Sequence, residues 1–352
     1  MMQDFFSQSK KLIDQRLTLF WREQTEILSA TRAGSNERVA LLEPFVRQGK
    51  MLRGGLTLLA ASMFGGERNK SAVSVAAAIE LVHSGLLIHD DITDRDRMRR
   101  GSPTIFAAYE KIGAQQGAID PYHYGSSLGI FSGDSVYFSA LALVVEVEDP
   151  VQLRRILQLV SQHVTACCAA QMEDISLGLL PTIPLEEEIL TIYRYKTAGY
   201  SFILPLQCGA VLADQNAQVL VELSSIGLKL GLLYQIKDDE LGLFGEESQT
   251  GKPVGSDIEE GKKTLYYVHL MNRANQDDRL RLNRIFGSHD ITADALAEVK
   301  KYLTLYGVDK AISEKLQSLE KEVLSEIELL DIASAYKLIL RHLVDYSLGR
   351  QS

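Results

Sequence analysis

Three aspartates stand at the end of an apolar, helix-forming stretch that runs from Ser71 to Asp94. In a helix, Asp90 and Asp94 project from nearly the same face, and Asp91 lies about a quarter-turn aside. Negative charge at a helix C-terminus opposes the helix dipole, and like charges four residues apart repel each other. The pattern therefore predicts either a solvated acidic helix end or a place where a cation compensates the carboxylates.

Four arginines follow these aspartates before the chain reaches a glycine and a proline: Arg95, Arg97, Arg99 and Arg100. A guanidinium binds phosphate through two parallel hydrogen bonds. A Mg2+ ion prefers one or two carboxylates, with phosphate oxygens and water in its other positions. Carboxylates, arginines and a metal ion together indicate a diphosphate site. The alternative at this point is a network of surface salt bridges that needs no ligand.

A second acidic pair, Asp238 and Asp239, follows another apolar helical stretch. Beyond it lies a glycine-punctuated loop over residues 251–264, with Lys252 and Lys262 near its ends. Lysine is a mobile point charge suited to phosphate, and glycine allows close approach of the backbone. We interpret the pair and the loop as a second half of the same site. The spacing of a nucleotide-binding P-loop is missing, which excludes a P-loop nucleotide hydrolase.

The elements that must position these residues have helical patterns almost throughout the chain. Only 8 of the 352 residues are proline, about 2% against a typical ~5%, so helix interruption is rare. Steps of three and four residues predict a helix with one buried face along Ile312, Leu316, Leu319, Val323, Ile327 and Leu330. Hairpin patterns are absent, and none of the loops at 101–103, 117–124, 181–184 and 245–261 has the composition of a domain linker. We therefore predict one large all-α domain over residues 1–352, with minimal sheet.

The composition excludes several classes of protein. The net charge of −9 repels polyanions, so nucleic acid is not an expected partner. The three cysteines, Cys167, Cys168 and Cys208, are an odd count without metal-ligand spacing, which fits a reducing cytoplasm. The N-terminal residues lack the apolar run of a signal peptide. The most apolar region, residues 126–147, never reaches the roughly 18 charge-free residues of a membrane span. We expect a soluble, cytoplasmic protein with no membrane span.

Taken together, the two halves resemble the all-trans (E) prenyl diphosphate synthases, the polyprenyl synthetase family that includes farnesyl and geranylgeranyl diphosphate synthases. The similarity extends by motif from Gly49 to Thr264 and by helical pattern beyond. It implies an isoprenoid-synthase-type fold, a single large helical bundle around a central cavity, and a homodimer. It also implies a prenyltransferase that condenses isopentenyl diphosphate with an allylic diphosphate (dimethylallyl, geranyl or farnesyl). Three Mg2+ ions would bind with the allylic diphosphate.

The resemblance assigns roles to the motif residues one by one. The implied metal ligands are the aspartates of two aspartate-rich motifs: Asp90, Asp91, Asp94, Asp238 and Asp239. Isopentenyl diphosphate would be held by Lys50, Arg53, His83 and Arg100, although a lone histidine on an apolar helix is more often a core residue. The allylic diphosphate would be held by Arg99, Lys196, Lys252 and Lys262. Gln171 and Asp174 match a further glutamine–aspartate element of the family.

The implied mechanism is ionisation, condensation and elimination. Metal held by Asp90, Asp94 and Asp238, together with Arg99 and the lysines, would stabilise the departing diphosphate. The double bond of isopentenyl diphosphate would attack the resulting cation, which the carbonyl of Lys196 or Thr197 and the amide of Gln235 would steady. The site would have to exclude water.

One departure from the family pattern concerns the second motif, which reads Asp238-Asp239-Glu240-Leu241-Gly242. Its usual final aspartate is a glycine here. Because Mg2+ needs only one or two protein carboxylates, we expect Asp238 to suffice for its ion.

The resemblance also allows a prediction of product length. In this family the prenyl tail runs between helices, starting from the first aspartate-rich motif. Bulky side chains one or two turns before that motif act as its floor. Here Gly85 and Leu86 occupy the positions five and four residues before the first aspartate, so no aromatic floor stands there. We predict products of twenty carbons or more, unless Tyr137, Phe138 or Met172 closes the tunnel. If Gly85 only allows close helix packing, the alternative is a farnesyl diphosphate synthase that stops at fifteen carbons.

Three other classes compete with this interpretation. A class I terpene cyclase shares the first aspartate-rich motif but has no need of the isopentenyl diphosphate cluster. A metal phosphohydrolase suggested by His89-Asp90 would need additional histidines. A non-catalytic regulatory subunit of a synthase would show eroded acidic motifs, whereas all five aspartates are present here.

Overall fold

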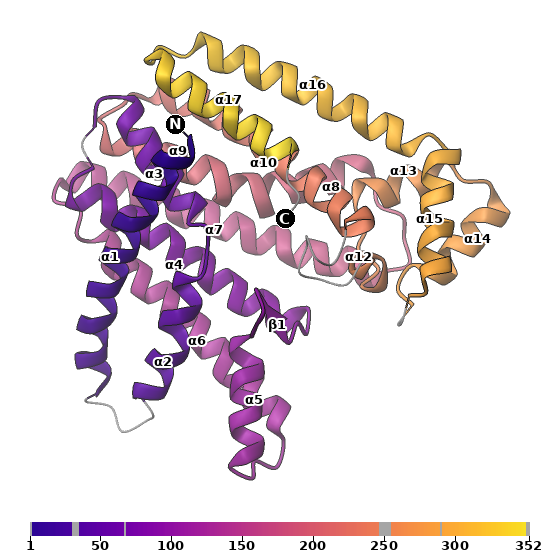
Figure 1. Ribbon diagram of the computed structural model, residues 1–352, viewed down its shortest axis with the longest axis horizontal. Coiled ribbons are helices and arrows are strands. Elements are labelled where there is room, and N and C mark those ends of the chain that lie inside the picture. The colour runs from indigo at the N-terminus through magenta and orange to yellow at the C-terminus, as the bar shows by residue number, and fades with distance from the viewer. Residues whose placement is uncertain (1, 30–34, 67, 246–254, 289–290, 350–352) are drawn as a thin grey trace. The chain divides into compact units, whose positions relative to one another are not determined.

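The structure, a computed structural model, describes residues 2–29, 35–66, 68–245, 255–288 and 291–349. The described chain is almost entirely helical (Figure 1). Its two short strands, β1 (Met98–Arg99) and β2 (Ser102–Pro103), pair as an antiparallel hairpin. The prediction of an all-α fold with minimal sheet is confirmed.

The chain divides into two compact units, each built from two separate segments. The first consists of Met1–Gln158 and Pro205–Asn216, and the second of Leu159–Leu204 and Ala217–Ser352. Each unit is described by itself below. The predictions of a single domain and of a central cavity concern both units and stay predictions.

The first unit packs its helices around the apolar helix α4. Its elements are α1 (Met2–Ser29), α2 (Ser35–Arg47), α3 (Leu52–Met63), α4 (Lys70–Thr93), β1, β2, α5 (Ile105–Gln115), α6 (Pro121–Val144), the first turns of α7 (Pro150–Leu179) and all but the first residue of α9 (Leu204–Leu212). Asn69, the residue before α4, caps the helix, because its side chain accepts a hydrogen bond from the Ala72 amide. The helix is buried on nearly all sides, as expected of a core helix that is apolar all round.

Glycines set the closest helix contacts of this unit. A Cβ atom on Gly85 of α4 would lie 2.9 Å from the ring of Tyr137 on α6, and one on Gly133 of α6 would lie 2.3 Å from the ring of His89 on α4. On each helix, a glycine therefore leaves room for an aromatic ring that belongs to the other helix. The two rings meet edge to face, with centroids 5.5 Å apart.

Helix α9 is held against α3 by the same kind of contact. A Cβ on Gly209 would lie 2.3 Å from the Thr57 carbonyl oxygen and 2.6 Å from the Ala60 Cβ. No larger residue fits at this position without moving one of the two helices.

The second unit is organised around α10. Its elements are the later turns of α7, α8 (Glu186–Ile192), the π-helix η1 (Tyr193–Ile203), α10 (Ala217–Phe244), α12 (Ser256–Glu259), α13 (Leu265–Arg273), α14 (Gln276–Ile285), α15 (Ala293–Leu305), α16 (Val308–Leu329) and α17 (Ser334–Leu348). Figure 1 shows α16 and α17, in yellow, running side by side. The predicted stripe of α16 is confirmed, since Ile312, Leu316, Val323 and Ile327 are buried.

The π-helix η1 spans eleven residues, from Tyr193 to Ile203. It packs closely on α10, because a Cβ on Gly231 would lie 2.3 Å from the Cβ of Ala198. Runs of π-helix are rare and occur often at functional sites. This one carries two predicted site residues, Lys196 and Thr197.

Three helices of the described chain are long and apolar enough, by length and composition, to cross a membrane: α4, α6 and α10. The most apolar window of α4 is 78% buried inside the protein, whereas those of α6 and α10 are each 39% buried. The prediction of a chain without a membrane span is therefore not confirmed and stays a prediction.

Candidate active site

The residues expected to hold isopentenyl diphosphate, Lys50, Arg53, His83 and Arg100, are called the basic cluster here. Unusual backbone conformations occur at two places beside it. Met51, just before α3, has φ +53°, a left-handed conformation that costs a non-glycine residue energy. Arg100 and Gly101, between β1 and β2, have φ +51° and +75°, as in the tight turns that join two-residue hairpins. The Arg100 guanidinium then lies 3.5 Å from the Cβ position of Gly49. The Gly49-Lys50 segment and Arg100 thus meet, as the motifs predict.

His83 lies within the electrostatic influence of three arginines. Burial, and then the positive charges of Arg53, Arg100 and Arg99, hold the pKa of His83 well below its ordinary value. The imidazole is therefore neutral at physiological pH. Positive charge from three guanidinium groups near a neutral imidazole favours an anion at this place.

Glu80 supports this cluster from one turn earlier on α4. Its carboxylate is buried and accepts a hydrogen bond from the Gly54 amide at 2.7 Å. Burial raises the pKa of Glu80, while Arg53 opposes the increase. Sequence reasoning missed this residue, although its position three residues before His83 placed it on the same helix face.

The first aspartate-rich motif is held by Arg99. The Arg99 Nε donates to Asp91 Oδ1 at 2.6 Å, and its Nη2 lies 3.9 Å from Asp90 and 3.8 Å from Asp96. The Asp91 side chain is only 1% exposed. Its burial raises the pKa of Asp91 to about 7 against the opposing effect of Arg99. Arg99, expected at the allylic diphosphate, thus contacts the aspartates themselves.

The donor groups of this motif suit a magnesium ion bound together with phosphate. The Asp91 Oδ2 atom is buried without a hydrogen-bond partner within the described part of the chain, while Asp90 and Asp94 are partly exposed. Among the described residues, no three His, Cys, Asp or Glu side chains come together as a complete metal site. Because Mg2+ takes one or two carboxylates and completes its shell with phosphate and water, these residues fit that ion.

In the second unit, a chain of hydrogen bonds links the π-helix to α10. The Thr197 hydroxyl donates to Gln235 Oε1 at 2.6 Å, and Gln235 Nε2 donates to Asp239 Oδ1 at 2.8 Å. The Tyr193 hydroxyl donates to Asp239 Oδ2 and accepts from the Leu265 amide at 3.1 Å. The amide of Gln235 is therefore fixed at both ends. Tyr193 was missed by sequence reasoning, and only its place three residues before Lys196 marks it.

Asp238 and Asp239 lie in different surroundings. Asp239 is buried, burial raises its pKa well above the ordinary value, and both of its oxygens accept hydrogen bonds. Asp238, the preceding residue of α10, is exposed. Of the two predicted metal ligands, Asp238 is the accessible one, and Asp239 orders the residues around it.

The predicted lysines of the second unit are held by carboxylates. Lys196 lies 2.5 Å from Asp174 of α7, which matches the glutamine–aspartate element expected near it. Lys262 lies 3.3 Å from Asp257 and 2.8 Å from Glu260. Lys252 lies outside the described residues.

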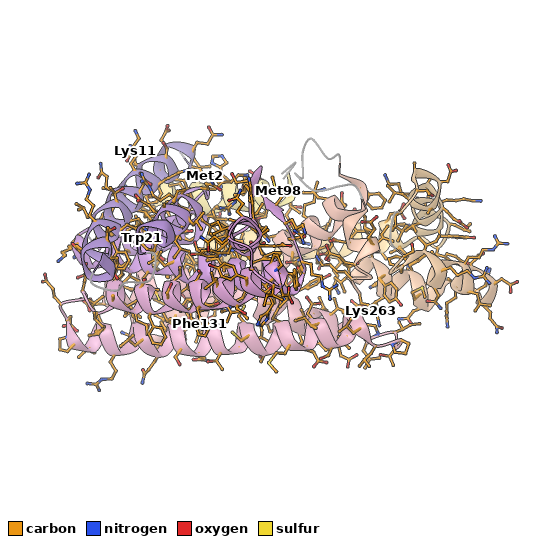
Figure 2. The ribbon with its side chains drawn as sticks, turned by 90° about the horizontal axis from the view of Figure 1, so that it is seen from below. Met2, Lys11, Trp21, Met98, Phe131 and Lys263 are labelled. Atoms are coloured by element: carbon orange, nitrogen blue, oxygen red, sulfur yellow. The ribbon has the colours of Figure 1, made fainter. Side chains whose placement is uncertain are left out.

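The neighbouring Lys263, labelled in Figure 2, bonds instead to carbonyl oxygens just after α7, those of Leu180 and Thr182. This lysine holds backbone carbonyls at the end of a helix, a common position for a cation.

The space that Gly85 leaves on α4 is filled by Tyr137. Phe138, the next residue on α6, is 72% exposed, and Met172 belongs to the second unit. Of the three side chains expected to close a tunnel, Tyr137 is the one in contact with Gly85. The prediction on product length therefore depends on this ring as well as on the glycine.

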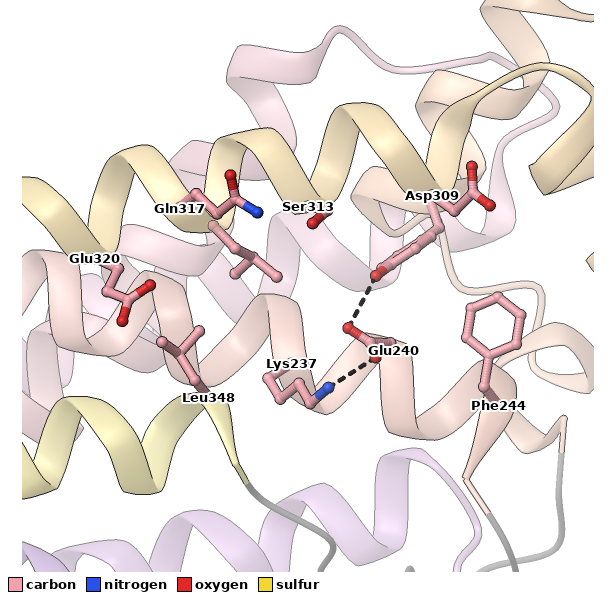
Figure 3. Close-up of a pocket in the computed structure, with 10 residues that line it drawn as sticks. Lys237, Glu240, Phe244, Asp309, Ser313, Gln317, Glu320 and Leu348 are labelled. Carbon is pink, nitrogen blue, oxygen red and sulfur yellow. Dashed lines mark hydrogen bonds and ion pairs between the residues drawn. The ribbon is translucent and has the colours of Figure 1, made fainter.

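A pocket of about 370 Å³ opens on the other side of α10 (Figure 3). Lys237 and Glu240, 2.7 Å apart, lie on its wall, and the Tyr266 hydroxyl is 3.3 Å from Glu240. Helical spacing places Lys237 and Glu240 on the face opposite Asp238 and Asp239. The pocket contains none of the predicted site residues.

Comparison with known proteins identifies the class. The family model for polyprenyl synthetase matches residues 39–303, which include both aspartate-rich motifs and the basic cluster. The chain belongs to the polyprenyl synthetase family.

The relatives and solved structures agree with this assignment. The chain is 34% identical over 256 residues to a short chain isoprenyl diphosphate synthase of Methanothermobacter thermautotrophicus, an alignment that covers 72% of this chain and 73% of the relative. It is 29% identical over 314 residues to a geranylgeranyl diphosphate synthase of Saccharolobus solfataricus, covering 87% and 88%. The crystal structure of a geranylgeranyl pyrophosphate synthase from Corynebacterium glutamicum, complexed with isoprenyl diphosphate and magnesium, matches with a TM-score of 0.90 at 28% identity, covering 97% of this chain and 98% of that one. The prediction of family and fold is confirmed.

Proposed function

We propose that this protein condenses isopentenyl diphosphate with an allylic diphosphate to an all-trans prenyl diphosphate of twenty carbons or more. The observation that carries the proposal is the meeting of Arg100 with the Gly49-Lys50 segment, beside Arg99 bound to the first aspartate-rich motif. A site for one diphosphate next to a site for metal-bound diphosphate is what a two-substrate prenyltransferase requires. The names of the relatives support the same reaction.

The basic cluster binds isopentenyl diphosphate in this proposal. Lys50, Arg53 and Arg100 supply charge, and the neutral His83 supplies a directed N–H donor. Held in this way, the double bond of the substrate is presented in one orientation, which lowers the entropic barrier to attack on the allylic carbon.

The aspartates would hold magnesium. The residues that fit are Asp90, Asp94 and Asp238, with three ions expected from the resemblance. Bound Mg2+ would neutralise the allylic diphosphate and stabilise its charge as it departs. Lys196 adds a positive charge in the second unit, and Asp174 positions its ammonium. That the two motifs act on one diphosphate stays a prediction.

The Gln235 amide would act on the carbocation. Thr197 and Asp239 fix both ends of this amide, so its carbonyl dipole needs no reorientation when positive charge develops nearby. Electrostatic stabilisation by such preorganised dipoles is commonly a large part of catalysis.

A homodimer is the assembly we propose, because α6 exposes an apolar stripe. Phe131 and Phe138, seven residues apart, are 70% and 72% exposed, and Val145 continues the same spacing. Exposed apolar stripes of this kind mark interaction surfaces, and a two-fold axis would pair the stripe with its own copy. Phe138→Glu should shift the sedimentation coefficient from dimer to monomer. The matched control, Leu329→Glu at an exposed leucine of α16, should leave it unchanged.

One incubation tests the proposed reaction. The protein is supplied with Mg2+, isopentenyl diphosphate and each allylic primer in turn, and the products are separated by chromatography. We expect prenyl diphosphates of twenty carbons or more, and no product when Mg2+ is chelated. A cyclised hydrocarbon would indicate a terpene cyclase instead, and no turnover would contradict the proposal.

Product length is tested with two variants of the Gly85 contact. Tyr137→Ala removes the ring from the space beside Gly85 and should lengthen the products. Gly85→Phe should shorten them. If the wild type stops at fifteen carbons, the prediction from Gly85 is wrong.

A further inference from the structure

The glycine that interrupts the second aspartate-rich motif leaves room for a carboxylate from elsewhere. On α10, Gly242 lies four residues after Asp238 and therefore on the same helix face. A Cβ built on Gly242 would lie 2.2 Å from Asp257 Oδ2 and 2.8 Å from Asp257 Cγ. The carboxylate of Asp257 thus occupies the position where the side chain of residue 242 would begin.

The backbone holds Asp257 in this position. The Gly255 amide donates to the Gly242 carbonyl at 3.2 Å, which ties the start of α12 to the end of α10. Gly255 reaches this contact with φ +85°, a conformation that favours glycine. Ile258, the next residue after Asp257, is fully buried and anchors α12. These contacts hold the backbone of Asp257 beside Gly242.

The side chain of Asp257 is oriented by a cation on its other side. Its Oδ1 lies 3.3 Å from the Lys262 ammonium, and the Lys262 amide donates to the Asp257 carbonyl at 2.9 Å. The side chain is 16% exposed. Oδ2 faces Gly242, and the negative charge of Asp257 reaches the second motif, where it is one cause of the raised pKa of Asp239.

We propose that Asp257 supplies the carboxylate that the second aspartate-rich motif lacks at Gly242, and that it acts with Asp238 toward the magnesium ion of that motif. The inference rests on the proposed function, because it assigns a residue to the same metal-dependent site. Asp238 and Asp257 then supply two carboxylates on one face at the end of α10, which matches the one or two that Mg2+ takes beside phosphate and water. The glycine is required, because a side chain at 242 and the Asp257 carboxylate cannot occupy the same space.

The test measures metal binding rather than turnover. Mn2+ is titrated into the full-length protein in the presence of inorganic pyrophosphate, and free Mn2+ is followed by electron paramagnetic resonance. Asp257→Asn should weaken Mn2+ binding about ten- to a hundredfold. The Mn2+ ions affected should be the same ones whose binding Asp238→Ala weakens. Glu260→Gln is the matched control, because Glu260 also contacts Lys262 at 2.8 Å. It should bind Mn2+ as the wild type does.

A second variant removes no carboxylate at all. Gly242→Ala places a methyl group where Asp257 Oδ2 lies, so the carboxylate is displaced and Mn2+ binding should weaken for the same ions. Far-UV circular dichroism confirms the fold of each variant, and if Asp257→Asn does not fold, Gly242→Ala decides. Wild-type Mn2+ affinity in either folded variant overturns the inference. Failure of the proposed function is seen separately, as a wild-type protein that binds Mn2+ and pyrophosphate but makes no prenyl diphosphate.

Discussion

The buried carboxylate of Asp91 should make the stability of the metal-free protein depend on pH. Burial raises its pKa to about 7 in the folded chain, from an ordinary value of 3.8. A raised pKa means that the folded state binds the proton more tightly than the unfolded state. The stabilisation is therefore complete below about pH 4 and is lost as the pH rises through 7. For these two pKa values, linkage gives a loss of about 2.5 kcal/mol in the free energy of unfolding between pH 5 and pH 8.

Asp91→Asn removes this titrating group. The difference between the wild-type and variant free energies of unfolding therefore isolates the contribution of Asp91. Urea unfolding of wild type and variant, in the presence of a chelator, gives the two free energies at each pH. The wild-type value minus the variant value should fall by about 2.5 kcal/mol from pH 5 to pH 8. Arg99→Gln removes the charge that lowers the pKa of Asp91, so the loss should move to higher pH. A constant difference between wild type and Asp91→Asn would refute the reasoning.

Three further predictions concern the two aspartate-rich motifs, the hydrogen bond from Thr197 of the π-helix, and the glycine of α10 on which the π-helix packs. Asp90→Ala and Asp238→Ala should each reduce turnover by about two to four orders of magnitude, roughly 3–5 kcal/mol, with unchanged circular dichroism; turnover near the wild-type value would contradict the metal assignment. Thr197→Val removes the donor to Gln235 and should cost about 1 kcal/mol of stability together with a lower kcat, which an unaltered urea midpoint and kcat would disprove. Gly231→Ala pushes a methyl group into the π-helix and should destabilise the fold by about 1–3 kcal/mol; thermal unfolding at the wild-type temperature would show that the contact relaxes freely.

The helical architecture and the motif positions were predictable because they depend on local pattern. Apolar spacing placed a helix over Ser71–Asp94, and the structure has it over Lys70–Thr93. The stripe that begins at Ile312 is equally local, since each residue is three or four positions from the next. Family membership followed from long motifs in a fixed order.

The contacts within the candidate site were not predictable in the same way. The sequence predicted a loop at 101–103, but the Arg100-Gly101 turn lacks the usual asparagine or aspartate, so the hairpin itself was not predicted. The role of Arg99 depends on which carboxylate its guanidinium reaches, and Asp91 differs from Asp90 only through burial.

The discontinuous make-up of the first unit has a consequence for the order of folding during synthesis. Residues 205–216 complete this unit, and Gly209 seats α9 against Thr57 of α3. The segment Leu159–Leu204 of the second unit is synthesised between them. When residue 158 leaves the ribosome, the first unit therefore still lacks the contacts between α3 and α9. These contacts form only after α9 has been synthesised. A nascent chain halted before residue 205 would therefore present an unfilled surface on α3.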